Sequence, residues 1–144
     1  MRNTLHIILV SLQVICLIYI LATGPLLPTG YLLLFAFLAS LLFGLWAIME
    51  MKFRFNVFPD LRKGSELVIS GPYSLVRHPM YTSVLISSLC LVINNFTSSR
   101  LTVWILLFAV LIIKSHIEDR ILSSSFESFQ VYRNRTSRLI PYIF

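Results

Sequence analysis

The sequence predicts an all-α integral membrane protein with about four transmembrane helices and a C-terminal interfacial helix. The chain has 144 residues, of which 57% are hydrophobic and only 12% are charged. A soluble domain of this size needs more charge on its surface, and the mean hydropathy of +0.83 also favours lipid as the solvent. The apolar residues fall in long runs between short polar breaks, which is typical of membrane-crossing helices. We interpret residues 1–144 as a single domain.

Two long apolar runs occupy the first third of the chain. The first covers 5–22 and ends before Gly24, and the second covers 31–50 and ends before Lys52. Each is close to the ~20 residues that cross a bilayer core as a helix. Arg2 precedes the first run, as in a signal peptide, but the length of the run and the lack of a clear cleavage site favour a retained span.

Two shorter apolar runs follow, over 79–94 and 101–117. We expect these either to tilt, to thin the bilayer locally, or to form a short hairpin that does not fully cross it. The tail, 118–144, carries an apolar stripe that predicts an interfacial helix. The stripe consists of Leu122, Phe126 and Phe129.

The basic residues predict the orientation in the membrane. If the chain crosses four times, eleven of its twelve Lys and Arg residues share one side, including those in the connector 51–78, and only Arg100 lies on the other. The positive-inside rule then places both termini and the connector in the cytoplasm. The net charge of +6 therefore reports topology, and no motif indicates nucleic-acid binding. Cys16 and Cys90 lie inside apolar runs and are interpreted as packing residues, with no predicted metal site.

A polar layer is predicted where the last two apolar segments meet. In a helical hairpin turning near residue 97, positions whose numbers sum to about 195 lie at similar depth. Arg77 then lies level with Glu118, and Tyr81 lies level with Lys114. His78 shares a helical face with Tyr81, three residues away. Because ionisable groups are costly within a membrane, such a layer favours a functional site at the cytoplasmic end.

The start of the third segment predicts an anion-binding position. Pro79 suits the first turn of a helix, whose free N–H groups and partial positive charge would lie beside Arg77 and His78. Glu118 offers the opposite charge, so a zwitterionic ligand would find partners for both its ends. A purely structural interpretation stays open, in which Lys114 pairs with Glu118 and Arg77 anchors the chain at the interface.

Two sequence blocks carry a resemblance to a known family. Residues 71–81, GPYSLVRHPMY, resemble the GPYxxxRHPxY signature of the isoprenylcysteine carboxyl methyltransferase family, much of which related phospholipid N-methyltransferases share. Residues 118–126, EDRILSSSF, resemble its EExxLxxxF element, and Tyr132 with RLIP at 138–141 resembles its YxxxxxRLIP ending. The resemblance covers about residues 56–141.

The resemblance implies S-adenosylmethionine as cofactor, held in a cytoplasmic-side pocket below an entrance that faces lipid. The positions that match cofactor-binding residues of the family are Leu67, Val68, Tyr73, His78, Tyr81 and Glu118. Arg77 and Lys114 are the candidate catalytic residues, which would steer an anionic acceptor. Lys114 stands where family members often have Arg, which disfavours a bidentate carboxylate clamp.

The predicted reaction is methyl transfer to a lipophilic acceptor that enters from the bilayer, most simply the carboxylate of an isoprenylcysteine-like substrate. Alignment and desolvation supply much of the catalysis of such an in-line displacement. A carboxylate needs no base, whereas an ammonium acceptor must first lose a proton. Three alternatives stay open: N-methylation of a phospholipid or other amine, an NADPH-dependent reductase-like protein, and a non-catalytic membrane protein. Membrane lipids are expected partners, and the sequence does not predict an oligomeric state.

Overall fold

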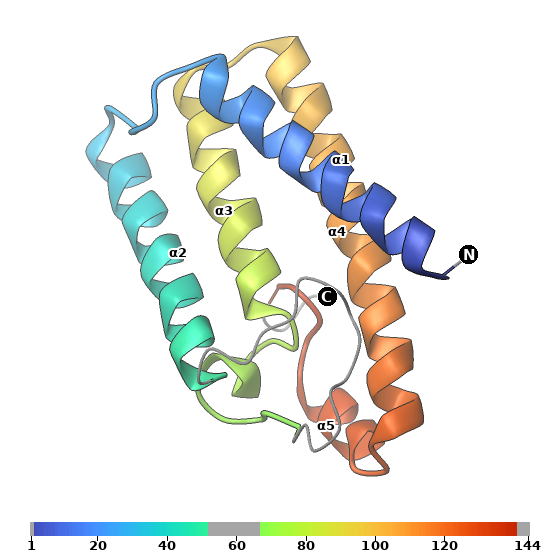
Figure 1. The fold of residues 1–144 in the computed structure, drawn as a ribbon. Helices are drawn as coiled ribbons and strands as arrows, with labels where there is room; N and C mark the ends of the chain where they lie inside the picture. The colour runs from blue at the N-terminus through green and yellow to red at the C-terminus, as the bar shows by residue number, and fades with distance from the viewer. Residues whose placement is uncertain (1, 52–66, 141–144) are drawn as a thin grey trace.

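The computed structural model describes residues 2–51 and 67–140, which form a bundle of helices (Figure 1). The elements are α1 (Arg2–Ala22), α2 (Tyr31–Glu50), the 3₁₀ turn η1 (Gly71–Ser74), α3 (Pro79–Asn94), α4 (Ser98–Ser125) and α5 (Phe129–Arg135). This confirms the predicted all-α class. Most of the predicted connector, 52–66, and the last tail residues, 141–144, lie outside the described residues.

The four long helices pack as two neighbouring pairs. The α2 helix lies along α3, α1 lies along α4, and α3 contacts both α1 and α4. The pairs enclose a buried apolar core that consists of Cys16, Ile20, Phe37, Leu85, Cys90, Leu91, Val92, Leu107, Leu111 and Leu139. Leu139 belongs to the segment after α5, so the end of the described chain is packed into the bundle.

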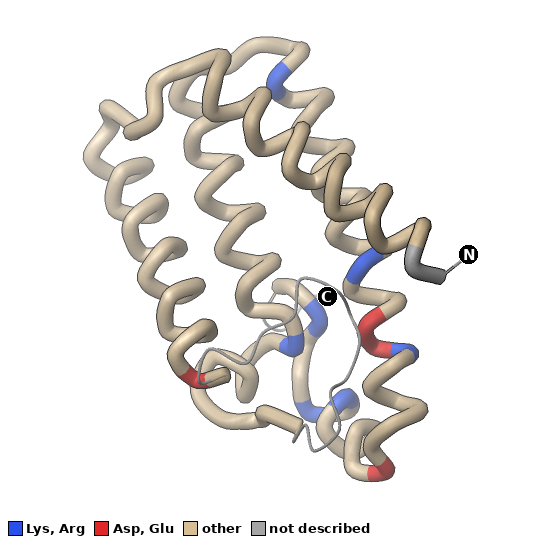
Figure 2. Tube along the Cα trace, in the orientation of Figure 1, with Lys and Arg blue, Asp and Glu red and all other residues tan. Residues whose placement is uncertain are grey.

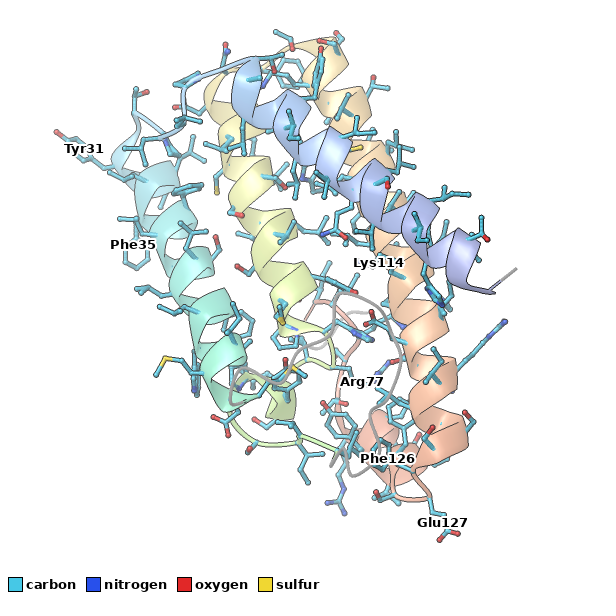
Figure 3. The ribbon with its side chains drawn as sticks, viewed as in Figure 1. Tyr31, Phe35, Arg77, Lys114, Phe126 and Glu127 are labelled. Atoms are coloured by element: carbon cyan, nitrogen blue, oxygen red, sulfur yellow. The ribbon has the colours of Figure 1, made fainter. Side chains whose placement is uncertain are left out.

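Within the described residues, three helices are long and apolar enough to cross a membrane, namely α1 over Thr4–Ala22, α2 and α4. The α3 helix is apolar but shorter, at 16 residues. Most side chains of the three long helices lie on the outside of the bundle. Tyr31 and Phe35 of α2, for example, point away from the other helices (Figure 3). Apolar faces of this extent are solvated by lipid, so the fold is that of a multi-pass membrane protein.

The last long helix extends beyond the predicted span at both ends. The predicted span 101–117 is part of a single helix of 28 residues, and residues 118–125 continue it. The helix begins at a favourable N-cap, because Thr97 Oγ1 accepts a hydrogen bond from the backbone N–H of Arg100 at 3.3 Å. It continues because no Gly or Pro interrupts it before Phe126. The separate C-terminal helix begins only at Phe129, whose side chain is fully buried.

Arg100 joins three helices at the end of the bundle opposite the other charges. Its guanidinium is buried and donates to the carbonyl oxygen of Ile20 at 3.0 Å, to Thr23 Oγ1 at 3.1 Å and to the carbonyl oxygen of Leu91 at 2.8 Å. The guanidinium thereby adds donors to carbonyls in the last turns of α1 and α3, of which the Leu91 carbonyl also accepts from the Asn95 N–H at 3.3 Å. In Figure 2 the coloured charges gather towards the other end of the bundle.

Candidate functional site

One buried imidazole bridges two carboxylates where the start of α3 meets α4. His78, the N-cap of α3, places Nε2 2.9 Å from Asp119 Oδ1 and Nδ1 3.2 Å from Glu118 Oε2. Burial alone would lower the pKa of His78, but its hydrogen bonds to Asp119 and Glu118 and their negative charges outweigh this and raise the pKa. The site therefore favours an imidazolium between two anions.

Tyr81 extends this cluster towards the middle of the bundle. Its hydroxyl donates to Glu118 Oε1 at 2.5 Å, and its ring stacks on His78 with centroids 5.6 Å apart. Lys114 Nζ lies 5.1 Å from the centre of the Tyr81 ring and donates to Gln13 Oε1 at 2.7 Å. The structure thus joins Tyr81, His78, Glu118 and Lys114 as the hairpin depth predicts, and adds Gln13 of α1, which the sequence analysis did not identify.

Arg77 is used to hold the C-terminal part of the chain. Its Nη1 donates to the carbonyl oxygens of Arg133, at 3.1 Å, and Thr136, and its Nε lies 3.4 Å from Asp119 Oδ2. Burial lowers the pKa of Arg77, and Asp119 partly offsets this. In Figure 3 Arg77 lies at the base of α3 and Lys114 lies on α4. The predicted role of Arg77 in steering an acceptor stays a prediction.

The segment after α5 runs beside the residues that precede α3. Val76 and Ser137 form a parallel bridge, in which the Arg77 N–H donates to the Ser137 carbonyl at 2.9 Å and the His78 N–H donates to the Arg138 carbonyl at 3.1 Å. Thr82 Oγ1 then donates to the Leu139 carbonyl at 2.6 Å. The sequence blocks around residues 71–81 and 132–140 are therefore physically joined.

Asp119 is the functional candidate that the sequence analysis passed over. Its Oδ2 lies 3.1 Å from Arg138 Nε, so this one carboxylate faces His78, Arg77 and Arg138. The available signal was its place beside Glu118, at the second acidic position of the EExxLxxxF element. Sequence spacing alone did not show that residues so distant along the chain would surround it.

Part of the predicted group of free N–H donors at the start of α3 is already hydrogen-bonded within the protein. Pro79 has no N–H, and the N–H groups of Tyr81 and Thr82 donate to the His78 carbonyl at 3.0 and 3.1 Å. The His78 N–H donates to Arg138. These backbone donors are therefore already used within the protein.

The 3₁₀ turn before α3 brings Tyr73 to the same end. Tyr73 is buried, and its carbonyl oxygen accepts from the Tyr132 hydroxyl at 2.7 Å. Burial raises the pKa of Tyr73, and the charges of Tyr132 and Glu118 raise it further. Leu67 and Val68 are half-buried in the segment that leads to this turn, and their roles as cofactor ligands stay predictions.

Glycine is required at the start of this turn. Gly71 has φ of +57°, and a Cβ there would lie 2.9 Å from Glu50 Oε2. Ser70 Oγ also donates to Glu50 Oε1. The end of α2 thereby fixes the position of the turn that carries Tyr73.

The fold and the site together define a class: multi-pass membrane proteins with a buried charged layer at one end of the helix bundle. The model of the phospholipid methyltransferase family matches residues 28–128, and the chain belongs to this family. The resemblance is thus confirmed at the level of isoprenylcysteine- and phospholipid-methyltransferase-like membrane proteins. Methyltransferases of the family act on lipophilic substrates and typically use S-adenosylmethionine.

Two curated relatives have names that refer to metal resistance. The cobalt-zinc-cadmium resistance protein CzcN of Cupriavidus metallidurans is 40% identical over 83 residues, which is 56% of this chain and 38% of the relative. The nickel-cobalt-cadmium resistance protein NccN of Alcaligenes xylosoxydans xylosoxydans is 35% identical over 83 residues, with the same coverage of 56% and 38%. The match thus spans under two-fifths of the length of each relative. No solved structure matches the chain.

Proposed function

We propose that this chain transfers a methyl group from S-adenosylmethionine to a lipophilic acceptor at the charged end of the bundle. The observation that carries the proposal is the network of His78, Tyr81 and Glu118, formed by two helices that are otherwise largely apolar. The family match supports methyl transfer over the NADPH-dependent reductase alternative.

The donor set fits a zwitterionic cofactor with ribose hydroxyls. The side chain of Glu118 has a relative solvent exposure of 21%, whereas those of His78 and Asp119 have 6% each. Glu118 is therefore the more accessible acid of the layer. It would accept hydrogen bonds from the cofactor's ammonium or ribose hydroxyls, while His78 and Tyr81 hold its two oxygens in place. When bound, S-adenosylmethionine supplies an electrophilic methyl group. Leu67, Val68 and Tyr73 complete the proposed cofactor site.

Lys114 is the better candidate for contact with the acceptor. It lies one helical turn from Glu118 towards the apolar middle of α4, where a lipophilic substrate would enter. Gln13 and Tyr81 position its ammonium group, whereas Arg77 is engaged with the C-terminal segment. We assign Lys114 the role of orienting and partly neutralising an anionic acceptor. A carboxylate, as in an isoprenylcysteine-like substrate, reacts without a base.

An amine acceptor is the second candidate, favoured by the description of the matching family as phospholipid methyltransferases. Product analysis with isotopically labelled cofactor separates the two, because an ester and a methylated amine differ in stability to base. Replacing Lys114 by Gln should suppress methylation of a carboxylate, since the paired ammonium is lost. The same change should leave methylation of an amine within a few-fold of wild type.

Direct metal binding is a third candidate, suggested by the names of the two relatives. Across residues 2–51 and 67–140, no group of three or more His, Cys, Asp or Glu side chains has the arrangement that a metal ion requires. The structure therefore offers methyl transfer more support than metal binding.

We further propose that the site faces the cytoplasm. The support is the gathering of basic residues towards one end of the bundle, with Arg100 at the other (Figure 2). Labelling of single cysteines introduced at Ser128 and at Ser98 in intact cells with a membrane-impermeant reagent checks the orientation. Modification at Ser98 and protection at Ser128 is the expected result.

Binding of the cofactor tests the proposal directly. In detergent, calorimetry should show that Glu118→Gln weakens binding of S-adenosylmethionine by at least about tenfold, because charge-assisted hydrogen bonds are worth about 1.5–3 kcal/mol. Glu127→Gln is the matched control, because Glu127 is an exposed acid in the turn between α4 and α5. Wild-type affinity in Glu118→Gln would remove the proposed role of this residue.

A further inference from the structure

A second polar site lies on the opposite face of α4 from the methyl-transfer layer. It is a cavity of about 430 Å³ between α4, α5 and the segment after α5, lined by His116, Asp119, Arg120, Ser123, Ser124, Arg133 and Arg138. At 100° per residue, His116 and Arg120 lie about 120–160° around the helix from Lys114 and Glu118. The two sites are therefore separated by the body of α4, with Asp119 between them.

The lining has the charge and donors of an anion site. Arg120, Arg133 and Arg138 contribute three guanidinium groups, against the single carboxylate of Asp119. That carboxylate already faces His78 and Arg77 on its other side, so its charge is largely offset within the protein. Arginine forks match phosphate oxygens in geometry and charge better than any other side chain.

Arg138 is held in place before any ligand arrives. Its Nε lies 3.1 Å from Asp119 Oδ2, and its Nη1 lies 2.7 Å from His116 Nε2. His116 is itself oriented, since its Nδ1 lies 2.9 Å from the Ile112 carbonyl and can donate to it while Nε2 accepts from Arg138. A side chain that is already positioned loses little conformational freedom when it binds, which favours affinity.

The depth of the cavity indicates which anion reaches it. The α4 helix has 28 residues and is about 42 Å long, whereas the hydrocarbon core of a bilayer is about 30 Å thick. Counted from Ser98, about 20 residues cross the core, so the helix leaves it near Ile117. Arg120 and Ser124 then lie at the level of the lipid headgroups.

We infer that this cavity binds a phosphate group, and the depth favours the phosphate of an anionic membrane lipid. The exposed Arg120 and Arg133 and the positioned Arg138 would contact the phosphate oxygens, with the Ser123 and Ser124 hydroxyls beside them. The site would hold the ends of α4 and α5 against the leaflet next to the entrance for substrate. It shares Asp119 with the methyl-transfer layer, and the binding proposed here does not depend on that activity.

The test titrates two probes into the full chain in uncharged detergent micelles: inorganic phosphate and the short-chain lipid dihexanoyl-phosphatidylglycerol. Wild type should show saturable binding, and Arg133→Gln should weaken it by about tenfold, the loss of one charge-assisted contact. Arg135→Gln is the matched control, with the same change of charge on an exposed residue of α5 outside the cavity lining. It should stay within twofold of wild type.

Arg120→Gln provides a second variant from the other wall of the cavity, and its binding should fall as in Arg133→Gln. Tighter binding of the lipid than of phosphate assigns the site to the headgroup, and equal binding assigns it to free phosphate; both support the phosphate site. Absence of saturable binding for both probes, or equal losses in Arg133→Gln and Arg135→Gln, would overturn the inference.

Discussion

The Nε2 atom of His78 lies 2.9 Å from Oδ1 of Asp119, although 41 residues separate them in the sequence. This contact joins the N-cap of α3 to α4 beyond the apolar part of the hairpin. Because Asp119 also faces Arg77 and Arg138, one carboxylate connects α3, α4 and the C-terminal segment. The candidate site and the packing of the tail therefore depend on the same ion pairs.

Replacing Asp119 by Asn should strongly destabilise the fold. The change keeps the shape of the side chain but leaves buried cations without their anion, at a cost of about 3–5 kcal/mol. We expect a clearly lower thermal unfolding midpoint in detergent and faster proteolysis after α5. Glu127→Gln, which removes an exposed acid, should change the midpoint little. Equal midpoints for the two variants would contradict the central role of Asp119.

The stability of the protein should depend on pH through His78. Its pKa is raised above the ordinary 6.5 because the contacts with Asp119 and Glu118 outweigh burial, so the folded protein keeps a proton that the unfolded chain releases. The stabilisation is fully present below pH 6.5 and is lost as pH rises through the raised pKa. Thermal unfolding midpoints in detergent at a series of pH values measure this loss of stability.

The matched pair for this experiment is His78→Gln and His116→Gln. His78→Gln should flatten the fall in unfolding midpoint between neutral and alkaline pH. His116, which is exposed on the outer face of α4, should be replaceable with the slope retained. If the pH dependence of the unfolding midpoint is retained in His78→Gln and lost in His116→Gln, it does not arise from His78.

Gly44 should not tolerate a side chain, because α2 and α3 approach closely there. A Cβ at this position would lie 2.8 Å from the Cβ of Ser83 and closer still to its hydroxyl oxygen. Gly44→Ala should therefore cost about 1–3 kcal/mol through overpacking. Gly30→Ala is the control, since a Cβ there meets nothing within 4 Å, and losing the preferred N-cap residue should cost less than about 1 kcal/mol. Unfolding by a denaturing detergent compares the two.

Arg100→Gln should loosen the end of the bundle that lacks the candidate site. The shorter amide cannot replace three hydrogen bonds to Ile20, Thr23 and Leu91, and buried acceptors would be left unsatisfied at about 1–3 kcal/mol. Hydrogen exchange should increase in the last turns of α1 and α3, while affinity for S-adenosylmethionine stays near wild type. Arg135→Gln, on the exposed surface of α5, should leave exchange in those turns unchanged.

The helices could be predicted because lipid imposes a simple rule on sequence. A span needs an unbroken apolar run of known length, and the predicted range 31–50 coincides with α2 while 79–94 coincides with α3. The meeting of Tyr81 and Lys114 followed from equal rise per residue in a hairpin. Both inferences use local geometry that the chain sequence determines.

The rest depended on contacts that have no local signature. A change from apolar to charged residues at Glu118 suggested the end of the span, but α4 continues as a helix because Glu, Arg and Leu are good helix formers and no Gly or Pro interrupts it before Phe126. The positions of Gln13 and Arg138 depend on how α1 and the C-terminal segment pack. The sequence suggested more free N–H donors in the first turn of α3 than the structure has, because the N–H groups of Tyr81 and Thr82 donate to the His78 carbonyl.

The parallel bridge between Val76 and Ser137 has a consequence for the order of assembly. During synthesis, residues 76–78 emerge well before their backbone partners Ser137 and Arg138, which follow all four long helices along the chain. The long helices can therefore be inserted while the candidate site is still incomplete. A nascent chain halted before residue 136 would have all four long helices but would lack the segment after α5 that pairs with residues 76–78 at the candidate site.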